Sequence, residues 1–227
     1  MKNKYFADIN DFRKYLLLRS ISDSGKIKIA ICWMLTPDDE RNDGMLTNYI
    51  NNPNTWRDEK DPWLFDTMSK CLKNGNRNVS LAEKYSIIPN AVYYDSILFS
   101  NSIKRKEYFE KFYHKSQDCD LIFFDPDNGF EVKSSRPGTK NSNKYLYWDE
   151  LSDFYKMDKS LLVYQHFPRI ERTKYLLYLT DRIKSETKAK RVICHKDSKV
   201  VYFLIPQEKD LDHFLGNNYL SLNTEIY

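Results

Sequence analysis

Glycine and cysteine are scarce in this sequence, and no long hydrophobic run occurs in it. Only six glycines stand among 227 residues, and none follows the first apolar run closely enough to form a glycine-rich phosphate loop. The four cysteines are far apart and show no Cys-x-x-Cys spacing, which argues against a zinc site or a disulfide framework. No secretory segment and no apolar stretch of membrane-spanning length is visible. We therefore expect a cytoplasmic protein with reduced thiols and no membrane partner.

The composition that remains is typical of a folded protein with charges of both signs. Hydrophobic residues make up 41% of the chain and aromatic residues 15%, which excludes a disordered sequence. The 36 basic and 32 acidic residues leave a net charge of +4, which permits a phosphate-bearing partner without requiring one. The length suits a single α/β domain over residues 1–227, with a loop-rich insertion at about 36–62 where Asn, Asp and Pro are frequent.

Apolar and amphipathic segments alternate along the chain. Strands are expected at 27–35, 120–125 and 160–166, and helices at 8–25, 62–75, 102–116, 147–157 and 169–186. Segment 80–89 fits either a helix or a strand, and segment 91–99 that follows it resembles a strand. Runs 190–196 and 199–206 predict a hairpin, followed by a helix at 209–216. The pattern predicts a three-layer α/β/α sandwich with a mostly parallel sheet and a C-terminal antiparallel hairpin.

Polar side chains follow three of the predicted strands. Asp38, Asp39 and Glu40 follow the first strand, Asp125, Asp127 and Asn128 the second, and His166 and Arg169 the third. Because ligands of open parallel sheets bind beyond the carboxyl ends of the strands, we expect these groups to share a site. Alternatively, Asp-Pro-Asp-Asn-Gly only forms a turn, without a functional role. His166 could likewise only cap the next helix, with Arg169 on the surface.

Two further segments combine basic and aromatic residues. Residues 133–148 place Lys133, Arg136, Lys140 and Lys144 before Tyr145, Tyr147 and Trp148, and residues 11–15 contain Asp11, Arg13, Lys14 and Tyr15. Cations that neutralise phosphates and rings that stack on bases favour nucleic-acid contact. An ordinary solvated loop and a solvated helix face are the alternatives. DNA is the partner that this pattern suggests.

Two motifs resemble those of the uracil-DNA glycosylase superfamily. "FDPDNGF" is similar to the Asp-Pro turn that positions the attacking water in those α/β/α enzymes, and "QHFPR" is similar to their later His-Pro-Ser loop. The resemblance implies a catalytic role for Asp125, Asp127 and His166, without a cofactor or a metal. For the substrate we expect contacts from Asn128, Phe130, Tyr147, Trp148, Lys133, Lys140, Arg169, Asp11 and Lys14. The expected function is excision of a modified or damaged base from DNA, in repair or in phage defence.

Other functions remain open from the sequence. The order of elements, with "FFDPDN" in the middle, also resembles the Rossmann-like class I nucleic-acid methyltransferases, whose Asp-Pro-Pro-Tyr motif holds the target base; this resemblance implies S-adenosylmethionine as cofactor. Asp125, Asp127, Glu131 and Lys133 would suit a metal-dependent nuclease. A nucleic-acid-binding or protein-binding module without catalysis is the non-enzymatic alternative.

Overall fold

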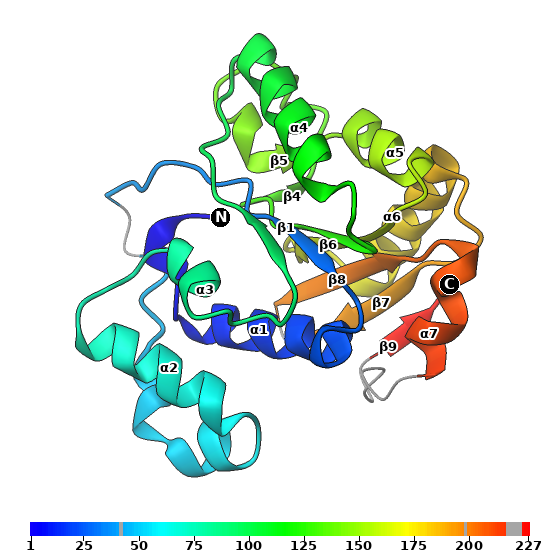
Figure 1. Cartoon of the computed structure of the whole chain (residues 1–227). Helices are drawn as coiled ribbons and strands as arrows, with labels where there is room; N and C mark the ends of the chain where they lie inside the picture. The colour runs from blue at the N-terminus through cyan, green and yellow to red at the C-terminus, as the bar shows by residue number, and fades with distance from the viewer. Residues whose placement is uncertain (41–42, 198, 217–223) are drawn as a thin grey trace.

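The fold is a twisted sheet between two layers of helices (Figure 1). The computed structural model describes residues 1–40, 43–197, 199–216 and 224–227. Within them the main sheet has the order β2-β1-β3-β6-β8-β7-β9. Its strands are β1 (Ile29–Cys32), β2 (Val92–Tyr94), β3 (Leu121–Phe124), β6 (Ser160–His166), β7 (Ile193–Lys196), β8 (Val200–Ile205) and β9 (Thr224–Ile226). A separate parallel pair joins β4 (Gly129–Phe130) to β5 (Tyr145–Leu146).

The directions of the strands confirm the predicted architecture. Strands β2, β1, β3 and β6 are parallel, whereas β8 runs antiparallel to both β6 and β7. The predicted C-terminal hairpin is therefore β7 and β8. It joins the main sheet through β8, which pairs with β6 from Leu161 to His166. Strand β9, which the sequence pattern did not predict, pairs with β7.

The helices are α1 (Ile9–Ser22), α2 (Pro62–Lys73), α3 (Ser80–Lys84), α4 (Ser102–Ser116), α5 (Trp148–Lys156), α6 (Arg172–Thr187) and α7 (Leu211–Gly216). Side-chain caps fix the starts of several of them. Asp8 accepts hydrogen bonds from the first turn of α1, and Asp61, Asn101 and Glu171 do the same for α2, α4 and α6. None of the helices in the described parts of the chain is long and apolar enough to cross a membrane.

Alternate residues of each strand face different helical layers. Ile29, Ile31 and Trp33 belong to the apolar cluster with α1 and α2, whereas Ala30 and Cys32 belong to the cluster with α4, α5 and α6. Because both faces of the sheet are covered, the central strands are continuous apolar runs without polar alternation.

Several boundaries differ from the sequence predictions. The ambiguous region 80–99 contains both a short helix, α3, and an edge strand, β2. The polar region 36–62 contains a short 3-10 helix at Asn48–Asn51 and a short π-helix at Asn54–Asp58. Tyr49 is buried there, and Tyr49 and Trp56 pack against Phe12 of α1. These aromatic contacts give the insertion a fixed structure that its polar composition did not indicate.

Candidate active site

Asp125 lies directly after β3 at the carboxyl edge of the sheet. The register pairs Phe124 with Cys32 of β1 on one side and with Val163 of β6 on the other. The turns after these three strands are therefore neighbours, as expected for a parallel sheet. The backbone N–H of Asp125 donates to the carbonyl of Cys32 at 3.1 Å, and the residue is 2% exposed.

A buried lysine joins Asp125 to helix α1. Lys14 Nζ lies 2.6 Å from Asp125 Oδ2 and 2.9 Å from Asp11 Oδ1, and all three residues are buried. Asp11 and Lys14 are three residues apart, so they share one face of α1. The Lys14 ammonium also lies over the ring of Tyr164 at 5.1 Å. A buried charge of this kind needs such partners, because desolvation would otherwise disfavour it strongly.

The pKa values of this cluster are shifted by burial and by the charges within it. Burial raises the pKa of Asp11 to about 7, although the Lys14 ammonium opposes the rise. Burial also acts against the charge on Lys14, but Asp11 and Asp125 outweigh it and raise the pKa of Lys14 well above its usual value. Asp11 Oδ2 is buried and has no hydrogen-bond partner within the described residues. Asp11 is therefore a carboxyl group that exchanges its proton near neutral pH.

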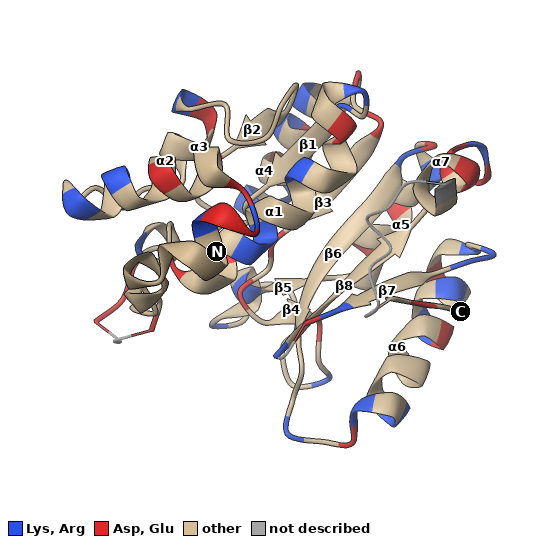
Figure 2. Cartoon of the chain, turned by 90° about the horizontal axis from the view of Figure 1, so that it is seen from below, with Lys and Arg blue, Asp and Glu red and all other residues tan. Residues whose placement is uncertain are grey.

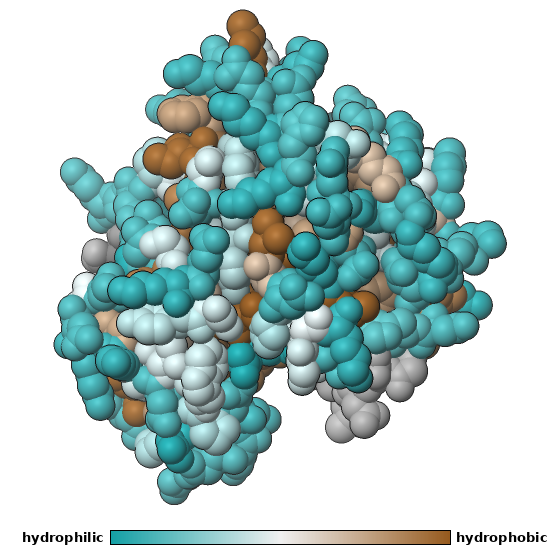
Figure 3. Space-filling model, in the orientation of Figure 1, coloured by the Kyte–Doolittle hydropathy of each residue, from teal (hydrophilic) through white to brown (hydrophobic). Residues whose placement is uncertain are grey.

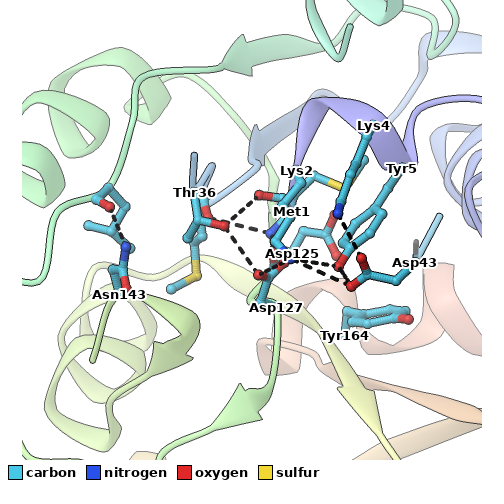
Figure 4. Close-up of polar contacts among 12 residues, drawn as sticks. Met1, Lys2, Lys4, Tyr5, Thr36, Asp43, Asp125, Asp127, Asn143 and Tyr164 are labelled. Carbon is cyan, nitrogen blue, oxygen red and sulfur yellow. Dashed lines mark hydrogen bonds and ion pairs between the residues drawn. The ribbon is translucent and has the colours of Figure 1, made fainter. Parts of the chain in front are cut away.

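Asp127, two residues further on, is held by the beginning of the chain. Its Oδ1 lies 2.9 Å from the Met1 amino group, and Thr36 Oγ1 donates to its Oδ2 at 3.1 Å (Figure 4). Burial alone would raise the pKa of Asp127, but the Met1 ammonium and Lys2 hold it below its usual value. Thr36 N donates to the Met1 carbonyl at 2.8 Å. Met1 thus fills the space between the turns that follow β1 and β3.

His166 is the last residue of β6 and the one exposed residue of that strand. Its Nε2 lies 3.2 Å from the hydroxyl of Tyr164, which is two residues earlier and therefore on the same face of the strand. Although His166 keeps an exposed surface, the protein atoms packed around its ring desolvate it and lower the pKa of His166, with Asp125 opposing the shift. The imidazole is consequently neutral near pH 7, and a neutral ring can still donate one hydrogen bond.

These groups line one pocket of about 200 Å³. The Asp125 turn and His166 therefore lie in the same pocket. Its lining contains five carboxylates, from Asp8, Asp11, Asp43, Asp125 and Asp127. The side-chain ammonium of Lys14 and the Met1 amino group supply positive charge beside them. The pocket interior is acidic, and Tyr5 and Tyr164 provide its aromatic surface.

An ionic network covers one side of the pocket. Lys2 and Lys4 contact Asp39 at 2.8 and 2.6 Å, and the Tyr5 hydroxyl donates to Asp43 at 2.6 Å (Figure 4). Of the acidic residues predicted to follow the first strand, Asp39 belongs to this network, and Asp38 accepts a hydrogen bond from Lys4 N. The acidic loop therefore pairs with the N-terminal segment, and Asp43 is its member that reaches the pocket.

The aromatic residues predicted to form the wall of the pocket lie elsewhere, which corrects the sequence prediction. Phe130 and Trp148 stack on each other at 4.5 Å, and both are 3% exposed within the core beside α5 and α6. Tyr147 is also buried, and its hydroxyl donates to the carbonyl of Ser135. Pairing of β4 with β5 brings these three residues together, and none of their three rings is free to stack on a base.

The predicted polar contacts divide in a similar way. Asp11 and Lys14 line the pocket, and their contact with a substrate stays a prediction. Asn128, Lys133, Lys140 and Arg169 are exposed and do not line it. Asn128 lies on the outer side of its turn, where its N–H donates to Lys144 O. The predicted contacts of Lys133, Lys140 and Arg169 with phosphates and of Asn128 with a base therefore stay predictions for residues outside the pocket lining.

Sequence reasoning missed several pocket residues. Tyr164 carried a usable signal, because it precedes His166 by two residues in a strand and must share its face. Asp8 was visible as a helix cap but not as a pocket residue. Met1 and Tyr5 carried no local signal, since they reach the pocket through contacts between segments distant in sequence.

The described residues contain no group of three or more His, Cys, Asp or Glu side chains arranged to hold a metal ion. The Glu131 side chain, which would belong to the nuclease constellation, accepts a hydrogen bond from Trp148 N at 3.3 Å. The spacing that suggested a nuclease therefore does not assemble a metal site in this part of the chain.

Comparison with known proteins gives one informative similarity. No protein-family model and no solved structure matches the chain. Among curated proteins, beta-porphyranase A of Phocaeicola plebeius is 27% identical over 145 residues, which cover 60% of this chain and 19% of the porphyranase. The match thus spans about a fifth of the length of that relative. It is a similarity to part of a protein named as a hydrolytic enzyme, and no family membership follows from it.

Proposed function

We propose that the pocket hydrolyses a glycosidic bond, and that the bond is the one between a base and its sugar in DNA. The observation that supports this proposal is that the Asp125 turn and His166 line one pocket at the carboxyl edge of the sheet. Hydrolysis of a glycosidic bond needs a carboxylate beside the sugar carbon and a group that stabilises the departing fragment. A carboxylate and a neutral imidazole fit these two roles.

The size and charge of the pocket suit a single ring system. A volume of about 200 Å³ is below the roughly 300–1,000 Å³ of pockets for drug-sized ligands. The acidic lining disfavours phosphate inside the pocket but suits hydroxyl and amino donors, and its carboxylates stabilise positive charge that develops on a sugar. A base flipped out of the helix would enter, while its phosphates stay outside.

Each residue then has a definite role. Asp125 orients a water and accepts its proton as the water oxygen bonds to the sugar carbon and the bond to the base breaks. Lys14 holds Oδ2 of Asp125, so Oδ1 is the oxygen that orients the water in this scheme. His166 donates a hydrogen bond to the departing base, and Asp11 stores a proton near neutral pH.

Basic residues beside His166 are placed for the flanking phosphates. Arg169 and Lys199 are exposed, and the N–H of Phe167 donates to the carbonyl of Lys199 at 3.0 Å, so the two segments adjoin. Arg169 is expected to hold phosphates, and the surface beside the pocket is where a nucleotide extruded from a strand would leave its phosphates.

The test is release of bases from oligonucleotides that contain normal, deaminated or hypermodified bases, measured by mass spectrometry and by alkaline cleavage at abasic sites. Asp125→Asn and His166→Gln are expected to lower the rate at least about 100-fold, in the range of general acid-base catalysis. Asp66→Asn, which changes an exposed carboxylate paired with Arg57, is the control and should keep full activity. Absence of base release from every substrate by the wild-type protein would refute the proposal.

A carbohydrate hydrolase is the second candidate, and the similarity to beta-porphyranase A favours it. The acidic pocket also suits sugar hydroxyls, and the same carboxylates would serve an oxygen glycoside. Formation of reducing ends from porphyran, abolished in Asp125→Asn, would support this candidate. Base release without reducing ends would support the first.

The site fits S-adenosylmethionine poorly. The turn after β1 contains no glycine, and Met34 there has a positive φ of 44°. Met1, which is 2% exposed, occupies the space between the β1 and β3 turns through hydrogen bonds to both sides. Calorimetry with S-adenosylmethionine should therefore show no saturable binding, and saturable binding would favour the methyltransferase instead.

A further inference from the structure

A second hollow lies apart from the pocket, where the loop after β4 meets α6. Its volume is about 240 Å³, and its lining includes Glu131, Lys133, Ser135, Arg136 and Arg182. A water takes about 30 Å³ in the liquid, so the hollow has room for several waters or for a small anion. None of these residues lines the Asp125 pocket.

The hollow is rich in cationic side chains. Lys133 and Arg136 are exposed and form no ion pair among the residues that the structure describes. Arg182 lies with its guanidinium 4.7 Å from the centre of the Trp148 ring, and its Nε is 3.4 Å from Glu186 Oε1. Stacking on the indole orients the guanidinium, whose Nη1 also donates to the Tyr178 hydroxyl at 3.3 Å, so Arg182 contributes positive charge more than free donors.

A buried hydroxyl lies among these cations without a partner. Ser135 is 8% exposed, and its Oγ is a buried atom with no hydrogen-bond partner within the described residues. Its backbone is fixed, because Ser135 N donates to Val132 O at 2.9 Å and the Tyr147 hydroxyl donates to Ser135 O at 3.1 Å. An unpartnered buried polar group is rare in proteins and commonly marks a place for a ligand or an ion.

Glu131 is the acidic residue of the lining, and its carboxylate is partly used. Its Oε1 accepts from Trp148 N at 3.3 Å. Burial raises the pKa of Glu131, with the Trp148 N–H and Arg182 opposing the rise. The lining therefore contains three cationic side chains, those of Lys133, Arg136 and Arg182, and one carboxylate, that of Glu131, which already accepts a hydrogen bond from Trp148 N.

We propose that this hollow binds a phosphate group, with Ser135 Oγ and the guanidinium of Arg136 as its principal donors. Arg182 and Lys133 supply further positive charge. Arginine recognises phosphate oxygens through two parallel hydrogen bonds, and a hydroxyl carried on a fixed backbone adds a neutral donor beside it. The site is independent of the proposed hydrolysis, because it shares no residue with the Asp125 pocket.

The test is calorimetric titration with inorganic phosphate at low salt. The wild-type protein should bind phosphate saturably. The Arg136→Gln variant should bind it at least about tenfold more weakly, because a charged hydrogen bond is lost, and the Ser135→Ala variant about threefold more weakly, because a neutral one is lost. Arg191→Gln, an exposed arginine outside the hollow, is the matched control and should bind normally. No saturable binding, or equal weakening in all three variants, would overturn the proposal.

Competition identifies the source of the phosphate. Displacement of phosphate by the dinucleotide TpT, but not by thymidine, would assign the site to a phosphodiester of a nucleic acid. Displacement by phosphomonoesters alone would assign it to a small metabolite. Asp125→Asn should bind phosphate like the wild type, so failure of the proposed hydrolysis leaves this result readable.

Discussion

At the residue scale, the site depends on one buried ammonium. Lys14 bridges carboxylates from α1 and from the turn after β3, so it joins two segments that are 111 positions apart. In a medium of low polarity, each carboxylate would be costly without this partner. The charge that positions Asp125 for chemistry is also a charge on which the fold depends.

Lys14→Met should lower the free energy of unfolding by about 3–5 kcal/mol, since it keeps much of the side-chain volume but leaves two buried carboxylates unpaired. Urea denaturation measures the change. Lys26→Met is the control, because Lys26 pairs with Asp23 on the surface and its side chain is 72% exposed, and surface pairs contribute little. Equal stability of Lys14→Met and wild type would show that the bridge has no energetic role.

The raised pKa of Asp11 makes stability depend on pH. The pKa of about 7 in the folded state exceeds the usual aspartate value of 3.8, so the folded state binds this proton more tightly than the unfolded state does. The Asp11 contribution is therefore greatest below pH 4 and is lost as the pH rises from about 4 to about 7. Asp11→Asn should remove this loss, which appears as a difference between the two curves of unfolding free energy against pH. Parallel curves would contradict the shifted pKa.

At the element scale, the turn that follows Asp127 is built around one glycine. Gly129 has φ +87°, and a Cβ there would lie 2.0 Å from Gln165 Oε1. The same oxygen accepts a hydrogen bond from Phe130 N at 2.8 Å. Gln165 of β6 thus fixes β4, and glycine is required both by the backbone conformation and by this close approach.

Gly129→Ala is expected to destabilise the protein by about 2–4 kcal/mol. The new Cβ would strain a backbone of positive φ, and its clash with Gln165 would break the hydrogen bond from Phe130 N to Gln165 Oε1. Gly138→Ala is the matched control: φ is +83°, but nothing lies within 4 Å of the added Cβ. Its effect should reflect backbone strain alone. Thermal melting distinguishes the two variants, and equal shifts would show that the contact with Gln165 is unimportant.

At the scale of the whole molecule, the two helical layers leave the site at one edge of the sheet. The face drawn in Figure 3 is mostly hydrophilic, with apolar groups near α4. Ile103 in the first turn of α4 and Phe99 just before this helix are exposed. Basic and acidic residues are interspersed along the helices (Figure 2) and do not form one continuous basic face in that view. We therefore expect contact with a phosphate-bearing substrate to depend on the few basic residues near each site.

The layers themselves were predictable, because burial of both sheet faces demands continuous apolar strands with amphipathic helices between them. The site was predictable in part. The strand ends indicated Asp125, Asp127 and His166, since parallel strands bring their carboxyl ends together. Spacing did not show that Phe130 and Trp148 stack in the core, because a ring beside a basic loop has the same local pattern whether it faces solvent or packs against α6.

The sequence by itself determined the central strands and the C-terminal hairpin, most of the helices and the polar turns at the ends of the strands, because these depend on periodicity and on local turn and cap chemistry. Only the tertiary structure decided that Lys14 bridges Asp11 and Asp125, that Met1 reaches Asp127, and that Ser135 is buried among cations. Each of these depends on burial and on contact between distant segments. Such contacts change the charge and availability of a side chain without leaving a local pattern in the sequence.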